Sequence, residues 1–147
     1  MDADITFHLL DAGNAQLMAG AEVFDGPLRP ASLAAFIEDP LHHLFFARQE
    51  TRVIGFTSGV VLYHPDKPPM MLISEVGVEE PQRRQGVAKA LVARLIDHAR
   101  ALGCEGIWLA TEGDNRAAQA LYASLGARRT DDILVYDWDG AMDDPTA

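Results

Sequence analysis

The sequence predicts an α/β fold in which helices cover both faces of a mixed β-sheet. Two observations indicate it: the first half of the chain is rich in short apolar runs typical of strands, and the second half alternates strand, helix, strand, helix and strand. The length of 147 residues fits one domain, and 48% hydrophobic residues can form its core. We expect this domain to cover residues 1–139, followed by a polar tail over 140–147.

Each element follows from a local pattern of apolar, turn and capping residues. Three prolines exclude regular structure from 64–69, because they fix φ and remove main-chain donors. Pro40 should end the helix before it, and Gly103 and Gly126 should end the two later helices. The expected strands are 5–10, 44–48, 53–57 with a continuation to 63, 70–78, 106–110 and 133–138. The expected helices are 14–23, 32–38, 87–102 and a last one that begins at Asp114 or Asn115 and ends before Gly126.

The segment from Glu79 to Lys89 joins a nearly all-apolar strand to the most regular amphipathic helix of the chain. Gly86 lets the main chain approach a ligand closely, and Ala88 leaves the first helical turn unobstructed. The free amides and positive dipole end of that turn form an anion site, beside which Arg83 and Arg84 add positive charge. A phosphate-binding loop is therefore predicted. A plain connecting turn is the alternative.

Composition and motifs exclude several other classes of protein. The formal net charge of −10 argues against binding to a nucleic-acid backbone and is compatible with a cationic substrate, although acidity can also serve solubility alone. His42, His43 and His64 lack the spaced partners of a metal site, so no metal is expected. The single cysteine and the absence of a signal or membrane-spanning pattern predict a cytoplasmic protein.

Two motifs resemble those of the GNAT superfamily of acetyltransferases. Arg83-x-x-Gly86-x-Ala88 is similar to its pyrophosphate loop, and the segment from Asn115 through Ala118 and Tyr122 to Gly126 is similar to its second CoA-binding helix. The resemblance covers roughly residues 5 to 139. It implies a mostly antiparallel sheet that is splayed at the cofactor site, acetyl-CoA as acetyl donor, and a homodimer.

The resemblance also implies roles for individual residues. Val76 and Val78, with Gly77 between them, would offer main-chain groups to the pantetheine arm, and Asn115 would bond to the CoA arm. Tyr122 would stand near the thioester sulfur as the acid. A simple N-cap is the alternative for Asn115, and a core aromatic for Tyr122. The implied cofactor-binding residues are Val76, Gly77, Val78, Arg83, Arg84, Gln85, Gly86, Val87, Ala88, Lys89, Asn115 and Ala118.

Acetyl transfer to an amine needs a base, because alkyl amines have pKa values near ~10. Glu75 is a carboxylate within an apolar strand, directly before the cofactor loop. Burial would raise its pKa toward a value useful for a general base, so Glu75 and Tyr122 are the predicted catalytic residues. A Glu75 that is simply paired by a neighbour is the alternative, and Glu112 is the reserve base or a substrate anchor.

Within the superfamily, the chain is most similar to the aminoglycoside 3-N-acetyltransferases. The similarity lies in Glu75, Glu112, Ala120-Leu121-Tyr122 and the closing Tyr136-Asp137-Trp138-Asp139. It implies a small cationic amine as the partner, with Asp25, Glu112 and Asp137 as substrate-binding residues and Glu22 as a further acidic group. The alternatives are another small amine, a peptide N-terminus, or a CoA-binding module without catalysis.

Overall fold

The computed structural model describes residues 4–83 and 86–143 of the chain. The chain divides into two compact units, Met1–Ala110 and Thr111–Ala147. The first unit holds the sheet and its covering helices, and the second holds one helix and the C-terminal segment. The expectation of one domain over 1–139 therefore stays a prediction. In the described part of the chain, no helix is both long and apolar enough to cross a membrane.

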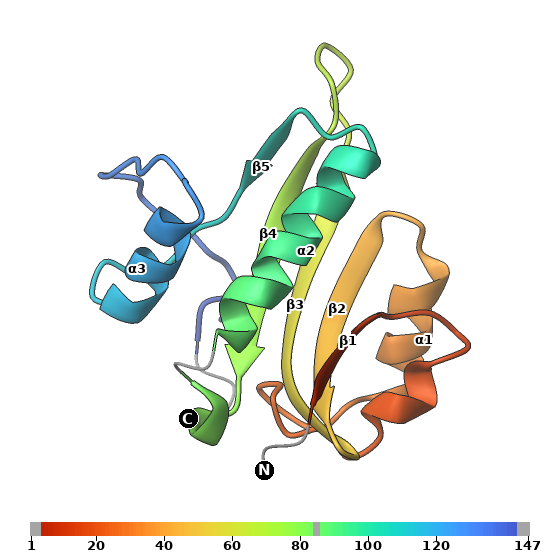
Figure 1. Ribbon diagram of the computed structural model, residues 1–147. Helices are drawn as coiled ribbons and strands as arrows, with labels where there is room; N and C mark the ends of the chain where they lie inside the picture. The colour runs from red at the N-terminus through yellow and green to blue at the C-terminus, as the bar shows by residue number, and fades with distance from the viewer. Residues whose placement is uncertain (1–3, 84–85, 144–147) are drawn as a thin grey trace. The chain divides into compact units, whose positions relative to one another are not determined.

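The first unit is a five-stranded sheet in the order β1-β2-β3-β4-β5 (Figure 1). Neighbouring strands from β1 to β4 are antiparallel, and β5 is parallel to β4. A mixed, mostly antiparallel sheet confirms the predicted fold class. The elements are β1 Ile5–Leu9, the 3-10 turn η1 Ala15–Met18, α1 Pro30–Glu38, β2 His42–Gln49, β3 Arg52–Leu62, β4 Met70–Val78, the 3-10 turn η2 Glu80–Gln82, α2 Val87–Ala101, β5 Gly106–Trp108 and α3 Arg116–Ser124.

Side chains that alternate along β2 and β3 build a core on each face of the sheet. On one face, Met18, Leu44, Phe46, Val53 and Phe56 pack with apolar residues of α1 and of the segment before it. On the other face, Ala47 and Ile54 pack against α2, which runs along the sheet in Figure 1. The buried stripe of α2 consists of Val87, Leu91, Val92, Leu95 and Ala99. Helices on both faces are thus confirmed within the first unit.

The N-terminal helices differ from the prediction. Instead of a helix over 14–23 there is only the short turn η1, because Gly20 adopts a left-handed φ of 76° two residues after its end. Asp11 and Asn14 close the turn before it through reciprocal bonds from each main-chain N–H to the other side chain, of 2.9 and 2.8 Å. The helix expected from Ser32 begins at Pro30, whose fixed φ suits the first helical position.

The predicted strand over 133–138 is absent from the described structure. These residues have no strand conformation, and Ile133, Tyr136 and Trp138 are 70%, 75% and 76% exposed. An alternating pattern supplies strand propensity, but a strand forms only where it finds a pairing partner. Strand β5 is likewise shorter than expected and ends at Trp108, because it pairs with β4 only over Met70–Leu72.

Candidate active site

Strand β4 carries Glu75 directly after an irregularity in its pairing with β3. Ser58 lies opposite Glu75 and Gly59 opposite Ile73, so Ser74 is an extra residue in β4. Such bulges bend a strand and redirect its side chains. The Ser74 hydroxyl lies 3.2 Å from that of Ser58, and Thr57 Oγ1 donates to the Glu75 carbonyl oxygen over 3.0 Å. The main chain at Glu75 is therefore held by the buried hydroxyl of Thr57, and the side chain of the preceding Ser74 contacts that of Ser58.

Glu75 lies on the face of β4 that the segment between η1 and α1 covers. Gly77, two residues along the strand, shares that face. A Cβ added to Gly77 would lie 2.8 Å from the Phe56 ring and 2.9 Å from the Val23 carbonyl oxygen. The close approach of Val23 requires glycine at 77, and the segment that contains Val23 also carries Asp25, whose charge acts on Glu75.

The surroundings of Glu75 favour its protonated form. Its side chain remains solvent-accessible, yet the protein around it displaces enough water to raise its pKa above the usual 4.5. The nearby carboxylate of Asp25 raises the pKa of Glu75 further. The structure thus brings together Glu75 and Asp25, which were predicted as base and substrate-binding residue. The direction of the shift suits a general base that works near neutral pH.

The edge of β4 that faces away from β3 is open beyond Leu72. In the described part of the first unit, β5 pairs with β4 only over Met70–Leu72. The Glu79 N–H bonds to the Ile54 carbonyl in β3, so by alternation the main-chain groups of Val76 and Val78 point to the opposite, open edge. Arg83 Nε, which donates to the Val78 carbonyl over 3.3 Å, agrees with this direction. Main-chain donors and acceptors are thus presented beside Glu75.

Helix α2 begins at the predicted anion site. Gly86 is its N-cap residue and has φ 76°, a left-handed conformation that favours glycine. Among the described residues no side chain caps this helix, and its first turn holds no acidic residue. Val87 is buried, whereas Ala88 is half-buried and Lys89 exposed. The first amides are therefore free to bind an anion. The predicted contributions of Arg84 and Gln85 lie outside the described residues.

Asn115, Ala118 and Tyr122 belong to the second unit. Asn115 is the N-cap of α3, and its Oδ1 accepts from the Ala118 N–H over 3.0 Å, which is the capping alternative considered for this residue. Tyr122 is half-buried, and burial raises its pKa above the usual value of 10. A tyrosine of this kind stays protonated at neutral pH and can donate a proton.

Glu112 and Asp137 also lie in the second unit, and both are exposed. The Glu112 carbonyl accepts from the Asn115 N–H in the turn before α3. Their predicted role in substrate binding stays a prediction, as does the role of Glu112 as reserve base.

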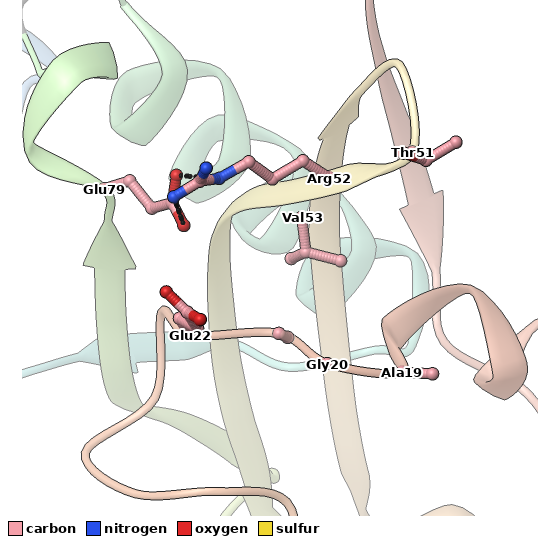
Figure 2. A pocket seen from close by; sticks show the side chains of 8 residues that line it. Ala19, Gly20, Glu22, Thr51, Arg52, Val53 and Glu79 are labelled. Carbon is pink, nitrogen blue, oxygen red and sulfur yellow. Dashed lines mark hydrogen bonds and ion pairs between the residues drawn. The ribbon is translucent and has the colours of Figure 1, made fainter.

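Several residues around the site escaped the sequence reasoning. Arg52 and Glu79 form a two-pronged ion pair, with Nε–Oε2 at 2.7 Å and Nη2–Oε1 at 3.0 Å, beside a pocket that Glu22 also lines (Figure 2). The supporting hydroxyls of Thr57 and Ser58 had a visible signal, because they interrupt an otherwise apolar strand. The ion pair had none, since its partners are 27 residues apart.

The histidines form no metal centre in the described part of the chain, where no three His, Cys, Asp or Glu side chains converge on a common point. His43 and His98 instead form a pair in which Nδ1 of one lies 3.0 Å from Nε2 of the other. This pair joins β2 to α2.

Comparison with known proteins places these features in a family. The model of the acetyltransferase (GNAT) family matches residues 15–127. N-alpha-acetyltransferase RimI of Mycobacterium tuberculosis is 30% identical over 115 residues, which is 78% of this chain and 70% of that protein. Mycothiol acetyltransferase of Kocuria rhizophila is 40% identical over 81 residues, 53% of this chain, and the match spans only 26% of the length of that relative.

Solved structures share the fold at low sequence identity. Aminoglycoside N-acetyltransferase AAC(6')-Iy in complex with CoA superposes with a TM-score of 0.78 at 19% identity, covering 95% of this chain and 97% of that one. The matches agree with the predicted class of protein and fold. The 3-N acetyltransferases, to which the sequence is similar, are not singled out by them.

Proposed function

The chain belongs to the acetyltransferase (GNAT) family, and on this premise we propose that it transfers the acetyl group of acetyl-CoA to a primary amine of a small polycationic acceptor, of which an aminoglycoside is the first candidate. The observation that carries the proposal is the position of Glu75. It lies beside the open edge of β4, and this strand leads directly into the loop before the uncapped end of α2.

The residues present fit acetyl-CoA. The first-turn amides of α2 and Arg83 would bind its pyrophosphate, and the main-chain groups of Val76 and Val78 would bond its pantetheine arm as an added strand would. The cofactor supplies an activated acetyl group as a thioester. A Cβ placed at Gly86 would meet no atom within 4 Å, so the space in front of the helix end is open. Glycine leaves that space to the ligand.

Glu75 supplies the proton acceptor in this proposal. An acceptor amine with a pKa near ~10 arrives protonated at pH 7 and must lose a proton before its lone pair can attack. The raised pKa of Glu75 makes its carboxylate a better proton acceptor than an ordinary surface glutamate. Tyr122, which stays protonated, is the group we assign to return a proton to the departing thiolate.

The charge of the protein supports a cationic acceptor. Asp25 lies near enough to Glu75 to shift its pKa, and the chain carries 22 acidic against 12 basic residues. An acidic site concentrates cations, so the Michaelis constant for a polycation should rise with ionic strength as salt screens the attraction over a Debye length of ~10 Å at 0.1 M. A Michaelis constant that is independent of salt would contradict a multiply charged acceptor.

A thiol-release assay with acetyl-CoA tests the proposal. The acceptor panel holds aminoglycosides, linear polyamines and peptides with free N-termini, the last because RimI is an N-alpha-acetyltransferase by name. We expect release with aminoglycosides, and mass spectrometry with NMR of the product identifies the acetylated nitrogen. The sequence similarity favours the 3-N position, whereas AAC(6')-Iy, which shares the fold, is a 6' enzyme by name.

Two outcomes would contradict the proposal in different ways. Turnover of peptides alone would keep the acetyl transfer and replace the acceptor. Binding of CoA in calorimetry without thiol release from any amine would leave a CoA-binding module instead of an enzyme.

A further inference from the structure

Glu79 directly follows β4, at the start of the loop toward α2, and it is held by both its main chain and its side chain. Its N–H donates to the Ile54 carbonyl oxygen over 2.9 Å. Its carboxylate accepts two hydrogen bonds from the guanidinium of Arg52, at 2.7 and 3.0 Å. The Glu79 side chain is only 9% exposed, whereas that of Arg52 is 63% exposed. Arg52 thus covers a nearly buried carboxylate.

The tip of the β2–β3 hairpin makes a second contact with the same loop. Arg52 is the first residue of β3 and lies opposite Gln49, the last residue of β2. Gln82, at the end of η2, lies with its Nε2 at 3.5 Å from Oε1 of Gln49. The hairpin tip therefore contacts the loop both before and at the end of η2.

Arg83, in the loop toward α2, lines the same recess as this ion pair. One shallow recess is lined by Glu22, Val23, Arg52, Val78, Glu79, Glu80, Pro81 and Arg83. Arg83 closes the loop on itself by donating to the Val78 carbonyl oxygen. Figure 2 shows the adjoining pocket, where the Arg52–Glu79 pair lies above Glu22 and Gly20. The recess therefore holds acidic groups next to the loop assigned to an anion.

We propose that Arg52 is a positioning residue for the pyrophosphate of acetyl-CoA: by pairing with Glu79, it neutralises a carboxylate at the start of the loop that leads to the anion site. The inference rests on the proposed function, since it presupposes acetyl-CoA as the ligand. The proposal gives the Arg52–Glu79 pair at the hairpin tip a role in cofactor affinity, which an ordinary surface ion pair would not have.

The charges give the proposal its direction. Without Arg52, the Glu79 carboxylate would remain unpaired at the base of the loop and would repel an incoming pyrophosphate. Without the negative charge of Glu79, the guanidinium of Arg52 would be an unpaired positive charge, which attracts an anion. Loss of Arg52 and loss of the Glu79 charge should therefore have unequal effects on cofactor binding.

The test compares Arg52→Met, Glu79→Gln and the double variant by calorimetry with CoA and by kinetics with acetyl-CoA and acetyl-pantetheine. We expect Arg52→Met to raise the Kd for CoA about tenfold, an effect of the size that one charge-assisted contact has on affinity. Glu79→Gln should bind CoA at least as well as wild type, and the double variant should recover most of the loss. Acetyl-pantetheine lacks the pyrophosphate, so its kcat/KM should not change in any variant.

Arg100→Met is the matched control, because Arg100 pairs with Asp97 at 3.8 Å near the opposite end of α2 and should not affect Kd. An equal loss with acetyl-CoA and acetyl-pantetheine would overturn the proposal and show a general structural role. Failure of Glu79→Gln to rescue Arg52→Met would overturn it as well. If wild type itself bound no CoA, the proposed function would be wrong. If wild type and all variants bound CoA equally well, the proposed function would stand and only the role of Arg52 would be wrong. If Arg52→Met unfolds, Arg52→Lys and Glu79→Gln replace it in the test. Because both variants avoid an unpaired Glu79 carboxylate, both should bind CoA with at least the affinity of wild type, and a clear loss of affinity in either would overturn the proposal.

Discussion

The hydroxyl of Thr57 donates a hydrogen bond to the main-chain carbonyl oxygen of Glu75, with 3.0 Å between the two oxygen atoms. Thr57 is fully buried, so the donor is fixed within the core. The bond holds the strand where the extra residue Ser74 interrupts its pairing. The bond thus fixes the main chain from which the Glu75 side chain projects, and a fixed main chain helps to position a general base.

Replacing Glu75 with glutamine should remove the proton acceptor and leave the shape of the site unchanged. We expect kcat of Glu75→Gln to fall by about 10²- to 10⁴-fold, the typical contribution of a general base. The Kd for CoA should remain that of wild type, because the cofactor residues are untouched. Steady-state kinetics and calorimetry measure the two quantities.

Glu38→Gln, an exposed glutamate at the end of α1, is the control for this substitution and should behave as wild type. A Glu75→Gln variant that loses stability but keeps normal turnover per folded molecule would make Glu75 structural. Glu112 would then be the next candidate for the base.

The carboxylate of Asp25 should set part of the pH dependence of the reaction. Asp25 raises the pKa of Glu75, so Asp25→Asn should lower that pKa and leave more Glu75 ionised at a given acidic pH. We expect the acid limb of the kcat/KM profile to move to lower pH in Asp25→Asn. Asp66→Asn, in the loop before β4, should leave the limb in place. An unmoved limb in Asp25→Asn would mean that another group titrates there.

The sequence predicted those parts of the molecule whose patterns are local. Strand β4 has the predicted bounds, and α2 begins at Val87 and is followed by a left-handed Gly103 as expected, because a long apolar stripe and a glycine stop need no distant partner. The strand predicted over 133–138 depended on a partner that the described structure does not provide. The local sequence around either partner carries no signal for pairing between residues that are far apart in the chain.

The same distinction applies to the candidate site. Gly86 and Glu75 could be found because one opens a helix and the other interrupts an apolar strand. The bulge at Ser74 and the Arg52–Glu79 pair could not be found, since Ser74 becomes an extra residue only in a particular register and Arg52 meets Glu79 only after the sheet has formed.

Gly86 offers a test that separates main-chain strain from charge. Its φ of 76° should make Gly86→Ala less stable by about 1 kcal/mol, while the added methyl group has room. Gly86→Glu carries the same strain and places a negative charge at the helix end, so we expect it to lose CoA binding while Gly86→Ala keeps part of it. Chemical denaturation and calorimetry distinguish the two effects.

Gly103 provides the matched control at the other end of α2. It also has a left-handed φ, of 92°, and no atom within 4 Å of an added Cβ. Gly103→Glu should be destabilised like Gly86→Ala and bind CoA normally. Equal loss of binding in Gly86→Glu and Gly103→Glu would remove the cofactor from the N-terminus of α2.

The pair of His43 and His98 should make the fold sensitive to acid. Burial lowers the pKa of both histidines, and the charge of His98 lowers that of His43 further, with His42 adding a smaller effect. The Pro40 carbonyl and the Asp39 carboxylate oppose this shift at His43, and the Phe45 ring lies edge-on to His98. The surroundings of both rings therefore favour the neutral forms, and Nδ1 of His43 lies 3.0 Å from Nε2 of His98.

Because these pKa values are lower in the folded state, the unfolded chain binds more protons at mildly acidic pH, and folding becomes less favourable there. We expect the free energy of unfolding to be highest above the unfolded pKa of 6.5 and to fall as the pH drops from that value toward the folded pKa values. Denaturation curves at pH 5, 6, 7 and 8 should show this fall in wild type and in His64→Gln, which changes a loop histidine outside the pair. In His98→Gln the fall should be smaller, since one titrating ring is gone and His43 loses the neighbouring charge that depresses its pKa. An unchanged slope in His98→Gln would show that acid destabilises the protein elsewhere.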